Sequence, residues 1–387
     1  MAQPQPPSST PPQMPPPPPR KVANGKNGKN AKAGTTSCPA NVRETKIGFG
    51  FQPQPDLVTA NTVPELWSLT KVNNVLGTIE LTSEDDAQDI GKGDEFPENN
   101  YPQSASTTVP IEKYLSSEFA AWTFLFALGK GTKTGTAPGA LTYTAVVSDP
   151  AVDCINVPAF TWVEQIRPGV DAVVDHEFIG MCVNDFTLTL DSGPGRNNAK
   201  LMVNCLGTGN AQAPSGVTLP ATTKEHMLNA TSAAVLTVNG IDYLLGGNFI
   251  SLELRYSNNI RTDSGYYPGS GSQNGFAIRG RMEYNTREFS LTYVARAQKG
   301  SVELQNLLNQ VEGNTEIKIT GGMIGAGPAT HAIDLVFPRT LQSAYTTGDA
   351  DGLVTVQCTT KIMKPTDGVT PMVQLTAITE QDQIFGL

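Results

Sequence analysis

Residues 186–205 read FTLTL DSGPGRNN AKLMVNC, two segments of alternating apolar and polar residues around a turn rich in Gly, Pro and Asn. Alternation with a period of two places the apolar side chains on one face of a β-strand. The segments therefore predict a β-hairpin with a wide turn. Residues 235–245 (VLTVNGIDYLL) predict a second hairpin, because Asn239-Gly240 suits a type I′ turn, in which both central residues take a positive φ.

Alternating segments of this kind recur through most of the 387-residue chain. Further strands are predicted over residues 141–147, 159–166, 248–256, 276–284, 288–295, 316–320, 332–337 and 352–360. Charged residues make up 16% of the chain, below the roughly 25% of an average soluble domain, and the chain has 37 Gly and 29 Pro. This composition predicts an all-β fold with many turns. It argues against a coiled coil, a helical bundle or a nucleic-acid-binding domain.

Two segments have helical spacing instead. Residues 116–128 (SSEFAAWTFLFAL) are apolar nearly all round, with a serine cap and Gly129 as the stop, and predict a deeply buried helix. Residues 301–312 (SVELQNLLNQVE) predict a second, amphipathic helix that exposes one face to water. Its apolar face is expected to hold Leu304, Leu307, Leu308 and Val311.

These helices reveal an internal repeat. Residues 106–129 and 290–313 each contain a strand, a linker, a capped helix and a terminating glycine, at an offset of 184 residues. Each is followed by a β-rich stretch that ends in a similar strand, AKLMVNC (199–205) or GLVTVQC (352–358). The order predicts a tandem duplication, with one β-sandwich over residues 46–220 and a second over residues 221–387.

The first 45 residues differ in composition from the remainder. Ten of the first twenty are proline, and the next stretch is rich in Lys, Asn and Gly, so a disordered leader is predicted over residues 1–45. Residues 1–46 hold seven basic residues against Glu44 alone, a net charge of +6, which leaves −15 on residues 47–387. The acidic body is expected to repel DNA rather than bind it. Five cysteines without a CxxC pair predict reduced thiols rather than a disulfide framework.

Motifs for catalysis or cofactor binding are lacking, so no catalytic, cofactor-binding or metal-binding residues are predicted. The three histidines, His176, His226 and His331, lie far apart in the sequence. In Asp175-His176-Glu177, successive side chains of a strand would point to opposite faces and could not meet at one metal. The Gly-rich residues 129–135 lack the order of a phosphate-binding loop and follow a predicted helix, where such a loop must follow a strand.

Two long segments are candidates for contacts between subunits. Residues 80–98 (ELTSEDDAQDIGKGDEFPE) are strongly acidic and predict either a solvated loop or an arm that docks on a neighbouring subunit or lines a negatively charged passage. Residues 258–275 predict a second long loop with rigid apolar anchors. The interface candidates are Glu84, Asp85, Asp86, Asp89, Asp94 and Glu95 in the first segment, and Tyr266, Tyr267 and Pro268 in the second.

The order of these segments resembles that of the major tail tube proteins of bacteriophages with long, non-contractile tails. The likeness is carried by residues 45–52 (TKIGFGFQ), by GTIEL at 77–81 with the acidic segment after it, and by the helix that ends in FLFALG. It is clearest at residues 178–204 (FIGMCVNDFTLTLDSGPGRNNAKLMVN) and continues through the hairpin and long strand of residues 236–256. The resemblance spans about residues 45–365 and leaves out the leader.

This resemblance implies a β-sandwich or partial barrel of the tail tube type, in a structural protein of the virion tail made in the host bacterial cytoplasm. Such subunits close into rings, and the rings stack into a hollow tube that conducts phage DNA into the host during ejection. The implied partners are other copies of the chain, in trimeric pseudo-hexameric or hexameric rings, and the tape measure, tail tip and tail terminator proteins. DNA would pass through the lumen without specific binding, and no membrane is implied.

Two other interpretations remain open from the sequence. A different virion shell component, such as a capsid decoration or tail-completion protein, would form closed oligomers that do not stack. A carbohydrate-binding or carbohydrate-active β-sandwich would need an aromatic-lined cleft with two carboxylates. The chain has only three tryptophans, and one of them, Trp122, lies on the helix predicted to be buried.

Overall fold

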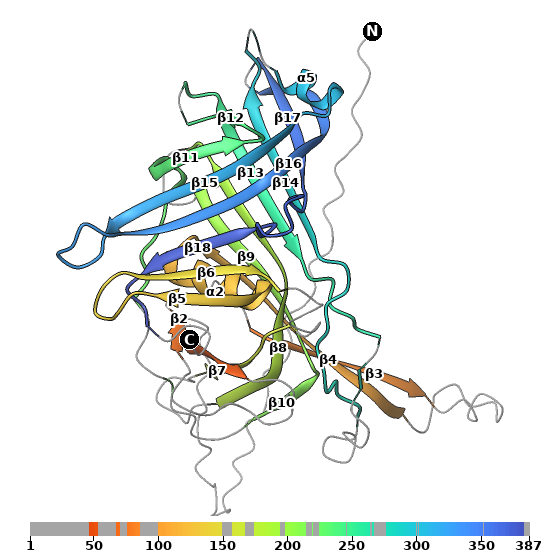
Figure 1. Cartoon of the computed structure of the whole chain (residues 1–387). Helices are drawn as coiled ribbons and strands as arrows, with labels where there is room; N and C mark the ends of the chain where they lie inside the picture. The colour runs from red at the N-terminus through yellow and green to blue at the C-terminus, as the bar shows by residue number, and fades with distance from the viewer. Residues whose placement is uncertain are drawn as a thin grey trace, which may run out of the picture. The chain divides into compact units, whose positions relative to one another are not determined.

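The computed structural model of the chain is drawn in Figure 1. It describes residues 46–52, 67–69, 76–85, 100–148, 157–166, 174–193, 198–213, 219, 224–244, 246–263, 265–266, 276–298, 300, 302–350 and 352–382. Every described residue belongs to one compact unit, within residues 39–387. The leader predicted over residues 1–45 therefore lies outside the described residues.

The described residues form an antiparallel β fold with two α-helices, which confirms the predicted all-β class. The elements before the middle of the chain are β1 (Lys46–Gln52), β2 (Trp67–Leu69), β3 (Thr78–Asp85), β4 (Asn100–Tyr114), α2 (Ser117–Leu128), β5 (Gly129–Thr134), β6 (Leu141–Val147), β7 (Ala159–Ile166), β8 (Val174–Asp191), β9 (Ala199–Gly207) and β10 (Asn210–Gln212). The later elements are a 3₁₀ turn at Ala230–Ser232, β11 (Ala233–Val238), β12 (Ile241–Asp242), β13 (Phe249–Ser257), β14 (Glu288–Arg296), α5 (Glu303–Leu308), β15 (Glu312–Met323), β16 (Thr330–Ala350), β17 (Leu353–Ile362) and β18 (Gln374–Thr379). Neither α-helix is long and apolar enough to cross a membrane.

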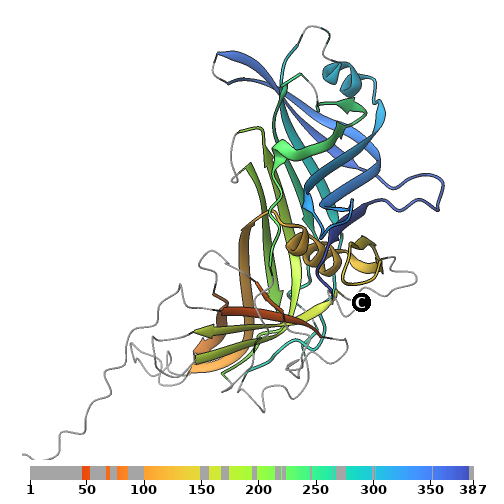
Figure 2. The same cartoon turned by 90° about the vertical axis from the view of Figure 1, so that its left-hand side faces the viewer.

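Helix α2 forms where the sequence predicts a buried helix. Ser116 caps it, because the Ser116 hydroxyl accepts a hydrogen bond from the backbone N–H of Phe119 at 3.2 Å. Gly129 ends it in the left-handed conformation, with φ of 89°. Every residue of α2 is buried, and the helix contacts β5, β6, β8 and β18 (Figure 2). The helix therefore lies inside the fold rather than on its surface.

Helix α5 is shorter than predicted. It spans only Glu303–Leu308 within the predicted range of 301–312, and the chain leaves the helical path at Gln310, whose φ is 52°. The apolar face predicted to be buried is largely exposed: Leu304, Leu308 and Val311 have relative exposures of 45%, 72% and 42%. Apolar spacing predicted the helix correctly, but it could not predict that this face has no covering element within the described part of the chain.

Both predicted hairpins are confirmed. Strands β8 and β9 pair with Leu188 opposite Leu201, and β11 pairs with β12 around Asn239 and Gly240, whose φ angles are 50° and 79°. Residues 276–284 were predicted wrongly as a strand, because in the described part of the chain this segment makes isolated bridges, at Ala277, Arg279 and Glu283, instead of a continuous ladder. Strand β18 was not predicted.

One hydrophobic core runs through strands from both predicted sandwiches. Strand β18 pairs on one side with β16 and on the other with β6, and β13 pairs with β8. Strands from residues 46–220 and from residues 221–387 therefore share one hydrogen-bonded network. The three described cysteines, Cys182, Cys205 and Cys358, are buried free thiols, in agreement with the predicted absence of disulfides among them.

Candidate subunit interface

Eight strands lie side by side in one continuous array, which we call the eight-strand array. Its order in space is β3, β4, β9, β8, β13, β14, β17 and β16, and each strand is hydrogen-bonded to the next. The first four strands and the last four repeat one arrangement. In each group the chain runs through the first two strands in spatial order, then reaches the fourth strand before the third. A tandem duplication predicts this repeated order.

The two groups meet at a seam, defined as residues 185–191 of β8 paired with residues 251–257 of β13. Helix α2 covers the seam: the Phe124 and Phe186 ring centroids are 5.7 Å apart, and the Tyr256 hydroxyl donates to the carbonyl oxygen of Ala127 at 3.1 Å. The Asn258 side chain donates to the same carbonyl at 3.0 Å. The seam is therefore sealed by a helix that belongs to the first group.

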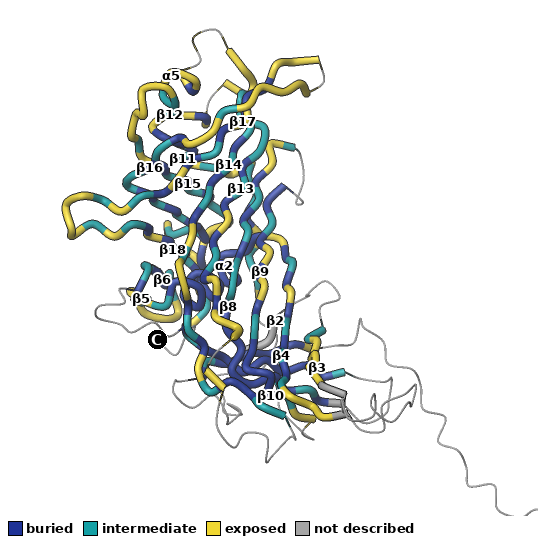
Figure 3. The backbone as a smooth tube through the Cα atoms, turned by 90° about the vertical axis from the view of Figure 1, so that its right-hand side faces the viewer, coloured by how far each residue is buried: buried dark blue, intermediate teal, exposed yellow. Residues whose placement is uncertain are grey.

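The outer edges of the array have no such closure within the described residues. Strand β3 pairs only with β4, and residues 342–350 of β16 pair only with β17. Each edge therefore presents backbone N–H and C=O groups that a further strand could pair with. Figures 1 and 3 place the β3–β4 hairpin and α5, which packs on β16, at opposite ends of the array.

Strand β3, at one outer edge of the array, carries apolar side chains. Strands β4 and β14 hold the same place in their groups, and their partners are β3 and β13. Because directly opposite residues on antiparallel strands share a face, β3 and β13 can be compared position by position. Ile79 and Leu81 lie opposite Thr107 and Ala105 of β4. The offset of 184 relates these two β4 residues to residues 291 and 289 of β14, whose partners in β13 are Leu254 and Tyr256.

The equivalent positions differ sharply in burial. Leu254 and Tyr256 are 0% and 1% exposed beneath α2, whereas Ile79 and Leu81 are 42% and 56% exposed. Near the other edge, Val354 of β17, the strand next to β16, is 59% exposed. Helix α5 contacts β16 as α2 contacts β8, yet its side chains Leu304 and Leu308 are 45% and 72% exposed. Both ends of the array therefore expose apolar side chains within the described residues.

The face of the array opposite α2 is polar and hollowed. Two adjoining depressions, which share Arg255 and Ser290, are lined mainly by Thr, Ser, Asn and charged side chains of β8, β9, β13 and β14. Two of the cations here are paired with carboxylates. Lys200 lies 3.0 Å from Glu112, and Arg255 is bonded to Glu253. Cations neutralised in this way attract phosphate weakly.

The predicted interface residues are only partly described. Asp86, Asp89, Asp94, Glu95, Tyr267 and Pro268 lie outside the described residues. Glu84 and Asp85 are the last residues of β3, so residues 80–85 belong to a strand rather than to the predicted acidic loop. Tyr266 is 38% exposed, and the Arg279 guanidinium lies 5.5 Å from its ring centroid. The exposed apolar positions on β3 were missed, although GTIEL shows the alternation of a strand.

A comparison with protein families identifies the family of this chain. A family model described as "Phage tail tube protein" matches residues 42–362, which include the whole eight-strand array. The chain belongs to the phage tail tube protein family. Tail tube proteins are structural proteins of the virion tail rather than enzymes, so membership confirms the structural role implied by the sequence resemblance. No curated protein matches this tail tube protein.

Proposed function

We propose that this tail tube protein closes into rings by pairing the β16 edge of one copy with the β3 edge of the next, and that the rings stack into a hollow tube that conducts phage DNA. The observation that carries the proposal is the exposure of Ile79 and Leu81 at positions whose equivalents, Leu254 and Tyr256, are buried at the seam. The edge contact would thus be a second, intermolecular seam. It would remove both open edges of the array.

Helix α5 would cover the intermolecular seam as α2 covers the internal one. The exposed leucines of α5, Leu304 and Leu308, would pack over Ile79 and Leu81 of the neighbouring copy. A heterologous contact of this kind joins two different surfaces and generates a closed ring when the rotation between copies closes. Because each chain supplies two four-strand groups, three chains would make a ring of six groups.

The polar face opposite α2 would line the lumen. Hydroxyl side chains line much of this face, and cations paired with carboxylates, such as Lys200 with Glu112, would attract the phosphates of DNA only weakly. DNA would then pass without being held. The tape measure, tail tip and tail terminator proteins remain the expected neighbours of such a tube in the virion.

The full-length chain should be examined by native mass spectrometry and negative-stain electron microscopy. We expect assemblies containing multiples of three chains, and hollow tubes in the micrographs. Rings of six chains would contradict the proposal that three chains supply the six groups of one ring. A monodisperse monomer, or closed oligomers that never stack, would contradict the tube and would favour a capsid decoration or tail-completion role.

Deletion of residues 86–95, which follow β3, tests whether the acidic segment acts in stacking. We expect the deletion to leave a folded chain that still forms rings, because β3 and its edge residues are kept, while the tubes become shorter. Tube length is measured in micrographs at equal protein concentration. Tubes of unchanged length would remove this segment from the stacking contact.

A further inference from the structure

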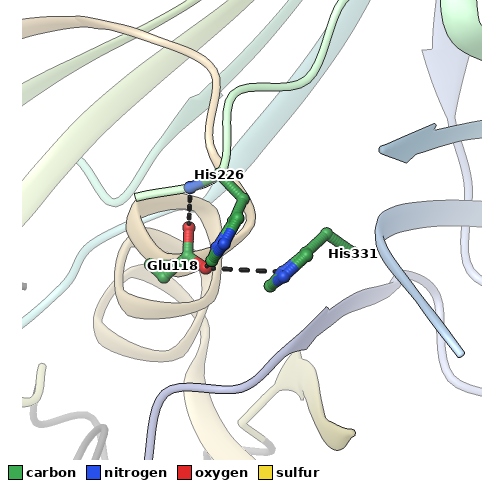
Figure 4. A group of neighbouring side chains, drawn as sticks. All are labelled: Glu118, His226 and His331. Carbon is green, nitrogen blue, oxygen red and sulfur yellow. Dashed lines mark hydrogen bonds and ion pairs between the residues drawn. The ribbon is translucent and has the colours of Figure 1, made fainter. Parts of the chain in front are cut away.

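Two histidines that lie far apart in the sequence lie next to each other at the N-terminal end of α2 (Figure 4). His226 belongs to the segment before the 3₁₀ turn, and His331 belongs to β16. Their rings are stacked, with centroids 3.6 Å apart and planes inclined by 17°. Glu118, in the first turn of α2, points at both rings: its Oε1 lies 2.9 Å from Nδ1 of His226 and 3.5 Å from Nδ1 of His331.

The surroundings hold this group in place. The Thr379 hydroxyl donates to Oε1 of Glu118 at 2.9 Å, and the backbone N–H of His226 donates to Oε2 at the same distance. The Ser117 hydroxyl lies 3.1 Å from Nδ1 of His331. Such contacts resemble the outer hydrogen bonds that orient the ligands of metal sites. The carboxylate therefore has a fixed position before anything binds.

His331 is the least satisfied member of the group. Its side chain is fully buried, and its Nε2 has no hydrogen-bond partner among the described residues. The nitrogen of His331 that lies within reach of Glu118 is Nδ1, so Nδ1 is the atom that would bind an ion shared with that carboxylate.

We propose that Glu118, His226 and His331 form a binding site for one divalent transition-metal ion, with Zn²⁺ as the best match. One donor atom from each residue lies within 4.8 Å of the other two. Two imidazoles and one carboxylate are a common protein ligand set for zinc. In a tetrahedral site with bonds of about 2.0–2.1 Å, neighbouring donors are about 3.3 Å apart, close to the two distances from Oε1 of Glu118.

Binding requires a small rearrangement of the rings. Stacked imidazoles cannot both direct an in-plane lone pair at one ion, so one ring must turn. His226 is the ring with room to do so, because its side chain is 20% exposed while that of His331 is 0% exposed. The ion would enter from the same side, where Glu380 lies 3.6 Å from Nε2 of His226 and is 39% exposed. Solvent or Glu380 would complete the coordination.

The ligands come from three separate elements. Helix α2 supplies Glu118, β16 supplies His331, and the segment between β10 and β11 supplies His226. A bound ion would therefore link the first strand group of the array to the second. We expect it to stabilise the chain against unfolding whether or not the chain forms rings.

The test uses untagged full-length chain, stripped of metal with a chelator and titrated with Zn²⁺ by calorimetry. The wild type is expected to bind one ion per chain, and Zn²⁺ is expected to raise its unfolding midpoint. His226→Gln and Glu118→Gln are expected to weaken binding at least tenfold and to abolish the thermal shift. His226→Gln is the safer variant for folding because it alters the partly exposed ring.

His176→Gln is the matched control, since His176 is the third histidine of the chain and is 42% exposed on β8. It should bind Zn²⁺ as the wild type does. The proposal is overturned if the wild type binds no stoichiometric Zn²⁺, which would leave the group as a hydrogen-bond network. It is equally overturned if His226→Gln binds as tightly as the wild type, which would place the ion elsewhere.

Discussion

Replacing Trp122 with alanine is expected to lower the free energy of unfolding by about 3–5 kcal/mol, the usual cost of removing a buried tryptophan side chain. Trp122 is fully buried at the centre of an aromatic cluster. Its nearest ring is that of Phe49 on β1, with centroids 4.3 Å apart, and Phe160 on β7 follows at 5.1 Å. The cavity would therefore open between α2 and the strands that it holds together. Chemical denaturation of the wild type and the variant measures the difference.

Trp122→Phe is the matched control. A phenylalanine keeps an aromatic ring in the cluster and removes the indole N–H, which is buried without a hydrogen-bond partner in the described part of the chain. We expect this variant to lose much less stability than the alanine variant, because less volume is removed and no partner is lost. An alanine variant within 1 kcal/mol of the wild type would contradict the buried position of α2.

The double variant Ile79→Lys, Leu81→Lys is expected to abolish ring formation while the chain stays folded. Each side chain would contribute about 1.5–3 kcal/mol on burial at every contact between copies. Two lysines would remove that contribution and would be costly to bury without an acidic partner. Both positions are already exposed in the single chain, so the melting temperature of the monomer should change little.

Val369→Lys is the control for the edge variant. Val369 is the most exposed of the large apolar residues described, at 88%, and lies in the turn before β18, which is not part of either edge strand of the array. It makes the same kind of change without touching the proposed contact. Native mass spectrometry should detect rings for this control and single chains for the double variant. Rings in the double variant would exclude the β3 edge from the contact.

Local pattern in the sequence predicted most of the elements. The alternation in FTLTL and AKLMVNC gave β8 and β9, and Asn239-Gly240 gave the turn between β11 and β12, because these signals come from neighbouring residues. Helix α2 was predicted with its caps for the same reason. The all-β class follows from these elements together.

The failures came where distant segments decide the outcome. Leu304 and Leu308 of α5 have the spacing of a buried face, but their exposure depends on whether another chain covers them. Residues 276–284 have strand-like residues, yet their backbone hydrogen bonds go to several separate segments, at Ala105, Thr208 and Gly265 among others, instead of to one partner strand. The meeting of His226, His331 and Glu118 depends on how β16 and α2 are brought together, which no local spacing records.

The seam between β8 and β13 also affects the entropy that is lost when the array forms. Two four-strand groups joined by one polypeptide meet as the chain folds, at a high effective concentration and without the loss of translational entropy that two separate proteins would incur. A ring assembled from such fused halves would need fewer encounters between free molecules. Its growth should accordingly depend less steeply on the concentration of newly made protein in the infected cell.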